Sequence, residues 1–213
     1  YKRQVSEGGT ITVNGLFDAG EATMSSTGYG ARWGGLMLGP STAATIQLSG
    51  SQLIEAAPAL TVSGLGSVVA DDVFMARSAS DPLLIVESGS AAELVVRNSH
   101  LQNGSGCAHV YPSTGLITFA NVSFADCEEQ AIWAQQAPLD FEGLTFDEGS
   151  DHGLELTGVS GTVAGVSAMN FNGEGAIVAL NNLAPGFLLS DVEGHVTGEG
   201  GIVGEGNDGV ILE

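Results

Sequence analysis

Asp71, Arg97 and His100 are three residues whose types could together support acid–base chemistry. A carboxylate, a guanidinium and an imidazole can hold, polarise and transfer a proton when they converge. Only five of the 213 residues are Lys or Arg, so cationic candidates can be considered one by one. Asp71 and Arg97 stand 26 residues apart, and they meet only if the fold repeats with that spacing.

The composition favours an all-β protein with a sizeable core. Hydrophobic residues make up 43% of the chain, and its 32 glycines with only 6 prolines indicate many tight turns rather than long helices. The formal net charge of −20 makes nucleic acid and anionic membranes poor partners. No apolar run has the length needed to span a bilayer, so no membrane insertion of this segment is expected.

A left-handed corner recurs along the chain. The stretch LVVRNSHL (94–101) alternates like a half-buried strand but contains Arg97 and Asn98 in its middle. Gly, Asn or Asp, which tolerate a left-handed backbone, recur with the same flanking pattern at intervals of 22 to 26 residues from Gly50 onward. The predicted corners are Gly15, Gly50, Asp72, Asn98, Asn121, Gly143, Gly165 and Asp191. We expect ladders of corner Asn and Asp side chains.

Apolar residues occupy fixed positions around each corner. They stand four and two residues before it, as Ile11 and Val13 do at the first corner, and mostly also one and three after it, with Ser51 and Ser99 as exceptions. This alternation predicts two short strands that are bent at the corner. A third strand follows, with the inward pairs Leu36/Leu38, Leu60/Val62, Leu84/Val86, Ala108/Val110, Ile132/Ala134, Leu154/Leu156, Ile177/Ala179 and Ile202/Gly204.

Three strands in each coil predict a parallel β-helix, right-handed as the commoner form, with about eight coils in one domain over residues 1–213. A Ser/Gly-rich insertion at about residues 18–34 is expected to form a surface loop or cap in the first coil. The final residues, GVILE, match the first strand of a further coil. We therefore interpret the chain as a segment of a longer protein, with its last edge covered by a partner or by further sequence.

Two stretches, NSHLQNGSG (98–106) and ITFANVSFADC (117–127), follow the order strand, Asn corner, strand, glycine loop. In this they resemble the parallel β-helix repeats of bacterial surface and secreted proteins in the pectin-lyase-like superfamily. The resemblance covers about the whole chain and concerns architecture, so it implies a fold more than a function. Enzymes of that superfamily use acidic residues to hold calcium with an Arg or Lys base, or a cluster of aspartates.

For a polysaccharide lyase or hydrolase, the candidate catalytic residues are Asp71, Arg97 and His100. Asp71 and Arg97 fall on one outward row in adjacent coils, about 5 Å apart at ordinary strand spacing. The alternative is a surface ion pair beside the corner, and we favour it because no further carboxylate converges there. No catalytic residue is therefore favoured.

Asp140, Glu142, Asp147 and Glu148 lie in one coil and offer the oxygen ligands that calcium prefers. Acidic strand edges also keep solenoids soluble, so a Ca²⁺ site is one of two interpretations. No cofactor is required.

The outward positions of the third strand are less polar than a solvent-facing row should be. The first row is predicted to hold Met37, Thr61, Ile85, His109, Trp133, Glu155, Val178 and Val203, and the second Gly39, Ser63, Glu87, Tyr111, Gln135, Thr157, Leu180 and Glu205. Stacking would gather His109, Tyr111, Trp133 and Gln135, flanked by Glu87 and Glu155. Such a surface suits a sugar or a protein partner. Alternatively, the insertion around Tyr29 and Trp33 covers it.

Cys107 and Cys127 match no metal-binding motif. They precede the third strand in consecutive coils, and whether they form a disulfide is open because their distances from that strand differ. A disulfide would indicate an oxidising compartment. That compartment agrees with the resemblance to secreted and surface proteins, and we expect an extracellular or cell-surface location.

Repetition without a convergent catalytic set favours a secreted or cell-surface module with a structural, adhesive or glycan-binding role. A polysaccharide lyase or glycoside hydrolase acting on acidic polysaccharide is the alternative, and a passive spacer stalk is a second one. The expected partners are a polysaccharide, another surface protein, or a second copy bound through the open coil ends or the third-strand face.

Overall fold

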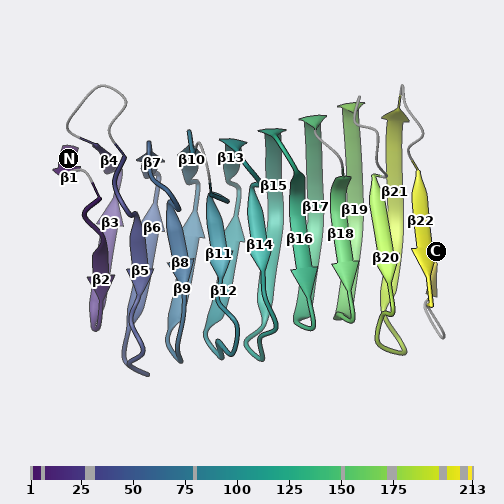
Figure 1. The fold of residues 1–213 in the computed structure, drawn as a ribbon, viewed down its shortest axis with the longest axis horizontal. Coiled ribbons are helices and arrows are strands. Elements are labelled where there is room, and N and C mark those ends of the chain that lie inside the picture. Colours follow the sequence, from purple (N-terminus) through teal and green to yellow (C-terminus); the bar gives the residue numbers. More distant parts are fainter. Residues whose placement is uncertain are drawn as a thin grey trace.

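A computed structural model describes residues 2–5, 8–26, 32–78, 81–149, 152–171, 177–196, 201–206 and 211–212. These residues form a parallel β-solenoid in which successive coils stack along the long axis of the molecule (Figure 1). The prediction of an all-β parallel β-helix is confirmed, and the winding is consistent with the right-handed form. Within the described ranges, no helix has the length and hydropathy to cross a membrane.

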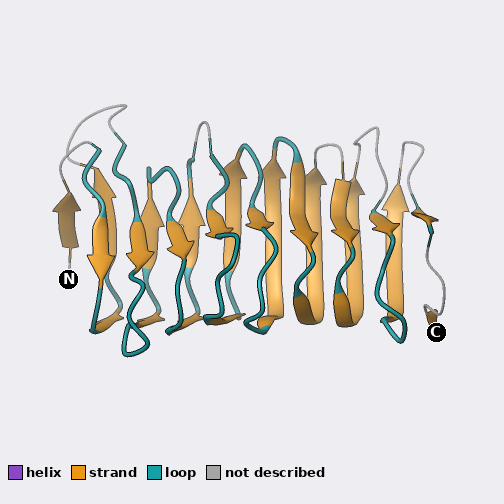
Figure 2. Cartoon of the chain, turned by 60° about the horizontal axis from the view of Figure 1, so that its bottom comes forward, coloured by secondary structure: helices purple, strands orange, loops and turns teal. Residues whose placement is uncertain are grey.

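The strands form two sheets in which every pair of neighbours is parallel, as Figure 2 shows for the successive coils. The 14-stranded sheet contains β1 (Lys2–Val5), β3 (Leu16–Gly20), β4 (Thr23–Ser26), β6 (Thr45–Ser49), β7 (Gln52–Ile54), β9 (Ser67–Asp71), β10 (Phe74–Ala76), β12 (Glu93–Arg97), β13 (His100–Gly104), β15 (Ile117–Cys127), β17 (Pro138–Gly149), β19 (Ser160–Phe171), β21 (Leu188–Val196) and β23 (Ile211–Leu212). The nine-stranded sheet contains β2 (Ile11–Val13), β5 (Leu36–Leu38), β8 (Leu60–Val62), β11 (Leu84–Val86), β14 (Ala108–Val110), β16 (Gln130–Gln135), β18 (His152–Thr157), β20 (Val178–Asn181) and β22 (Ile202–Glu205).

The core is a set of apolar columns that run from coil to coil. Val96 of β12 pairs with Ala70 of β9 on one side and Phe119 of β15 on the other, and all three are buried. Phe119 in turn stacks on Phe141 of β17, with ring centroids 4.8 Å apart and planes 7° from parallel. Each coil therefore buries its inward side chains against its neighbours, as the period-two pattern predicts.

The predicted corners adopt the left-handed backbone in seven of eight cases. Positive φ values occur at Gly50, Asp72, Asn98, Asn121, Gly143, Gly165 and Asp191. Part of the expected ladder is present, because the Asn121 amide donates to Asn98 Oδ1 at 3.4 Å. The Asn98 amide continues this ladder to Asp71 Oδ1 at 2.9 Å, and so reaches the residue before the Asp72 corner.

Two buried serines just after corners explain the exceptions in the apolar column. Ser99 Oγ accepts from the Val73 backbone N–H at 3.0 Å and donates to the Arg97 carbonyl at 2.7 Å. Ser51 Oγ likewise accepts from the Ala22 N–H at 3.3 Å and donates to the Ala19 carbonyl at 3.0 Å. These hydroxyls satisfy backbone groups of the preceding coil, and in the case of Ser99 also of its own coil, at a bend where a buried unpaired group would be costly.

The first coil corrects the predicted pattern. Ile11 and Val13 belong to β2 and pair with Leu36 and Leu38 of the nine-stranded sheet, so they do not precede a corner. Phe17 and Ala19 of β3 take that place beside Ile46 and Leu48. Glu21, with φ of 50°, makes the turn that Gly15 was predicted to make. The two apolar pairs look alike in the sequence, and Gly15 tolerates a left-handed backbone more readily than Glu21 does.

The predicted insertion is also shorter at its start, because residues 18–26 contribute to β3 and β4. Trp33 is buried in the core, and its indole N–H donates to the Ile54 carbonyl at 2.9 Å. It therefore does not cover the third-strand row. Tyr29 lies outside the described residues.

The register of one third strand differs from the prediction by one residue. Val178 and Leu180 align with Leu154 and Leu156, so they point inward and Ala179 and Asn181 take the outward positions. Because Ile177, Val178, Ala179 and Leu180 are all apolar, the alternation does not distinguish the two registers. At the end of the chain, β23 pairs with β21, as expected for the first strand of another coil.

The corner at Asn121 provides a stability test. Asn121→Val places a β-branched residue at φ of 54°, and we expect it to lower the free energy of unfolding by about 1–2 kcal/mol. Asn121→Gly removes the same amide contact to Asn98 without the backbone strain, so it should cost less. Urea denaturation of both variants measures the difference. Equal losses of unfolding free energy in the two variants would show that the amide contact, and not the left-handed backbone, is the reason for Asn at this position.

Candidate functional site

The outer face of the nine-stranded sheet carries a group of aromatic and polar side chains that we call the aromatic strip. It consists of residues on four adjacent strands or directly after them: Glu87, His109, Tyr111, Trp133, Gln135 and Glu155. His109 of β14 pairs with Trp133 of β16, which pairs with Glu155 of β18. The predicted assembly of these residues on one face therefore occurs in the structure.

Trp133 is the centre of the aromatic strip. Its ring centroid lies 5.2 Å from that of Tyr111 in an edge-to-face arrangement, and 5.5 Å from that of His109 at a tilt of 53°. Trp133 and His109 are half-buried, whereas Tyr111 is 38% exposed. The edge-to-face geometry is a favourable aromatic contact and fixes the rings relative to the sheet.

Polar groups border the rings on both sides. Glu155 is the direct neighbour of Trp133, about 4.8 Å away along the sheet. Gln135 pairs with Thr157, also at the outer face. On the other side, a shallow depression is lined by Ile85, Glu87, Ser88 and Tyr111.

His109 is held in a confined environment. A Cβ added at Gly106 would lie 2.6 Å from its Nε2, so the glycine backbone packs directly against the imidazole. This Nε2 is buried and makes no hydrogen bond within the described part of the chain. Burial lowers the pKa of His109, and the nearby Glu129 carboxylate opposes that shift.

Sequence reasoning missed the contributions of Ser88 and Gly106. Ser88 follows the third strand by two residues and lines the depression, and Gly106 belongs to the GSGC turn before β14. The glycine-rich character of that turn is the signal for the close approach to His109.

The three alternative catalytic residues do not converge through any contact found among the described residues. Arg97 Nη2 lies 3.0 Å from Asp71 Oδ2, so the predicted pairing of these two residues in adjacent coils occurs. His100 instead lies beyond the Asn98 corner on β13. Its Nδ1 lies 2.6 Å from Ser123 Oγ and its Nε2 lies 2.9 Å from Gln102 Oε1.

The Asp71 carboxylate is stabilised in its charged form. The hydrogen bond from the Asn98 amide and the Arg97 guanidinium lower the pKa of Asp71. Asp71 and Arg97 form a partly exposed ion pair, and Asp71 also accepts a hydrogen bond from the Asn98 amide. These contacts fit a structural role beside the corner better than a proton-transfer role.

The acidic coil contains no group of three or more metal-ligating side chains among the described residues. Asp140 accepts a hydrogen bond from Thr162 Oγ1 at 2.9 Å, and Glu142 precedes the Gly143 corner on the same strand. Asp147 lies after that corner, and the side chain of Glu148 is outside the described part. The calcium interpretation thus gains no geometric support here.

Cys107 and Cys127 form a disulfide with Cα atoms 5.5 Å apart. Cys127 ends β15 opposite Gly104 of β13, and Cys107 stands just before β14. Cys107 directly precedes its third strand, whereas Cys127 stands several residues before its own, and the turn between Gly104 and Cys107 brings the two cysteines together. The disulfide therefore fixes the turn that packs on His109.

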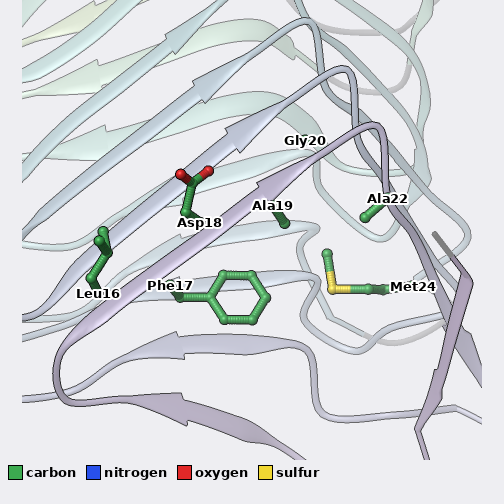
Figure 3. A pocket seen from close by; sticks show the side chains of 7 residues that line it. All are labelled: Leu16, Phe17, Asp18, Ala19, Gly20, Ala22 and Met24. Atoms are coloured by element: carbon green, nitrogen blue, oxygen red, sulfur yellow. The ribbon is translucent and has the colours of Figure 1, made fainter.

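A separate hollow lies at the first-coil end of the solenoid. A cavity of about 330 Å³ is lined by Leu16, Phe17, Asp18, Ala19, Gly20, Ala22 and Met24. Figure 3 shows Phe17 and Met24 facing one space while Asp18 points to the other side of its strand. Asp18 is the one charged side chain in this lining, and the other lining residues are apolar or glycine.

No family model, curated protein or solved structure matches this chain.

The confined imidazole leads to a pH prediction. Because burial lowers the pKa of His109 in the folded protein, the unfolded chain binds more protons below about pH 6.5. The stability associated with neutral His109 should be present above that pH and decrease as the pH falls through the lower folded pKa. NMR titration of the imidazole and urea unfolding at about pH 7 and about pH 5 measure both effects. An unchanged pH dependence in His109→Gln would contradict the prediction.

The disulfide leads to a stability prediction. Its cysteines are separated by 20 residues, and cross-links closing loops of this size stabilise by about 3 kcal/mol. We expect the double variant Cys107→Ala/Cys127→Ala to lose about that amount in urea denaturation. The variant should be insensitive to reductant, which provides the control. A loss below about 1 kcal/mol would show that coil stacking alone fixes the turn.

Proposed function

We propose that this protein is a β-helix module that binds a glycan through the aromatic strip. The observation that carries the proposal is the Trp133–Tyr111 edge-to-face pair on the outer face of a parallel sheet, with polar groups on either side. The role is one of adhesion or retention, and the module acts as a rigid platform.

The chemistry of sugars matches this surface. A pyranose ring presents an apolar C–H face, which packs on an aromatic ring, and hydroxyl edges, which need hydrogen-bonding partners. Gln135, Thr157 and Ser88 offer such partners beside the rings. An extended polymer can also follow the regular spacing of strands across the coils.

Binding is favoured over catalysis by the contacts at the alternative site. Arg97 is paired with Asp71, and both ring nitrogens of His100 are within hydrogen-bond distance of neighbouring side chains. A polysaccharide lyase or hydrolase using these residues would first have to break contacts that the fold supplies. The passive-stalk alternative predicts no ligand at all.

An extracellular or cell-surface location accompanies the proposal. The Cys107–Cys127 disulfide supports it, because such bonds persist in oxidising compartments. The repeat pattern, which resembles that of secreted β-helix proteins of the pectin-lyase-like superfamily, points the same way.

The proposal is tested by replacing the central ring. Trp133→Ala should reduce retention on a glycan array by about tenfold or more, because it removes the platform that also orients Tyr111. Phe74→Ala is the matched control, since Phe74 stacks on His100 at another outward position and is also half-buried. Circular dichroism and urea unfolding establish that both variants fold.

Two results would overturn the proposal. One is equal retention by wild-type protein and Trp133→Ala, which would place the binding surface elsewhere. The other is release of unsaturated uronate products that is lost in Arg97→Ala, which would identify a lyase.

A further inference from the structure

We infer that the ligand of the aromatic strip carries ammonium groups, and that it is a polymer of de-N-acetylated amino sugars. This inference rests on the proposed function and names the class of glycan. It is carried by three features together: aromatic rings on the outer face, carboxylates beside them, and the absence of Lys and Arg from the strands that form the strip.

The distribution of charge along the chain is the first argument. No Lys or Arg follows Arg97, whereas most of the 25 acidic residues do. Where basic residues are described, they lie in or beside the 14-stranded sheet: Arg97 pairs with Asp71, and Arg77 lies 3.8 Å from Glu55. The nine-stranded sheet therefore has no cation to pair with the carboxylate of a uronate.

The carboxylates of the strip surround its rings. Glu155 is adjacent to Trp133, and Glu87 lines the depression with Tyr111. Glu129 lies close enough to act on the pKa of His109. An anionic polymer would be repelled by these three groups, whereas a cationic one would be attracted.

The rings supply a second and independent attraction. Indole and phenol faces attract a cation within about 6 Å of the ring centroid, and the attraction is strongest for Trp. An amino sugar unites the two requirements of the strip, because its ring packs on an aromatic surface and its ammonium group meets a carboxylate. The amide and hydroxyl groups of Gln135, Thr157 and Ser88 remain available for its hydroxyls.

The test uses the whole chain and three β-1,4-linked hexamers: glucosamine, N-acetylglucosamine and glucose. Calorimetric titration is carried out at about pH 6, more than one unit above the ordinary pKa of a glutamate. The glucosamine hexamer should bind about tenfold tighter than the other two. Glu155→Gln and Glu87→Gln should each weaken its binding about three- to tenfold, with little effect on the neutral hexamers.

Two controls separate this site from general attraction to an acidic protein. Glu93→Gln removes an exposed charge from β12 in the other sheet, and it should leave affinity unchanged. Hexalysine carries ammonium groups without sugar rings, so it should bind more weakly than the glucosamine hexamer and lose less affinity in Trp133→Ala. Trp133→Ala should weaken binding of the glucosamine hexamer while preserving the fold.

The outcomes distinguish the inference from the proposed function. Equal affinity for all three hexamers, lost in Trp133→Ala, would overturn the cationic ligand and retain glycan binding. Binding of hexalysine that equals that of the glucosamine hexamer and depends equally on Trp133 would identify a basic peptide and overturn the inference. Absence of binding to every hexamer and to the glycan array would overturn both.

Discussion

In-register stacking of parallel coils is the constraint on which the rest of this structure depends. Each strand obtains its backbone hydrogen bonds and its apolar contacts from the coils on either side, and a single coil could satisfy neither requirement alone. The same stacking brings His109 and Trp133 into ring contact although they stand 24 residues apart. A shift of one residue in a strand would turn its whole outward row into the core. The strand register therefore determines which side chains meet on the outer face, and the aromatic strip depends on it.

The left-handed corners could be predicted because their backbone restricts the residue type. Asn98 and Asn121 mark the bend in the sequence, and the bend occurs there. The first corner could not be found in this way, since Glu21 adopts the same conformation without being a residue that favours it. Its position follows from the pairing of Phe17 and Ala19 with the next coil, which is a long-range interaction. Strand pairing outweighed local preference at that corner.

The candidate sites show a similar limit. Spacing alone predicted the Asp71–Arg97 pair, because both residues occupy the same outward position in adjacent coils. It did not predict the environment of His100, because the Asn98 corner puts this residue on another strand. There it stacks on Phe74 and lies near Ser123 and Gln102. Side-chain partners across a corner depend on the bend angle, which a repeat pattern does not contain.

Lys and Arg are absent from the strands of the nine-stranded sheet, and this distribution of charge affects which partners the aromatic strip can bind. Arg97 of the 14-stranded sheet and Arg77 beside it are paired with Asp71 and Glu55, and the strands of the nine-stranded sheet contain no Lys or Arg to pair with their own carboxylates. Two copies joined through this face would bring Glu87 and Glu155 of each against those of the other, with no cation between them. Like charges at a desolvated contact oppose association, and the net charge of −20 adds to that repulsion. These charges favour a partner that differs from this chain in charge, and this is why we propose a ligand for the strip and not self-association.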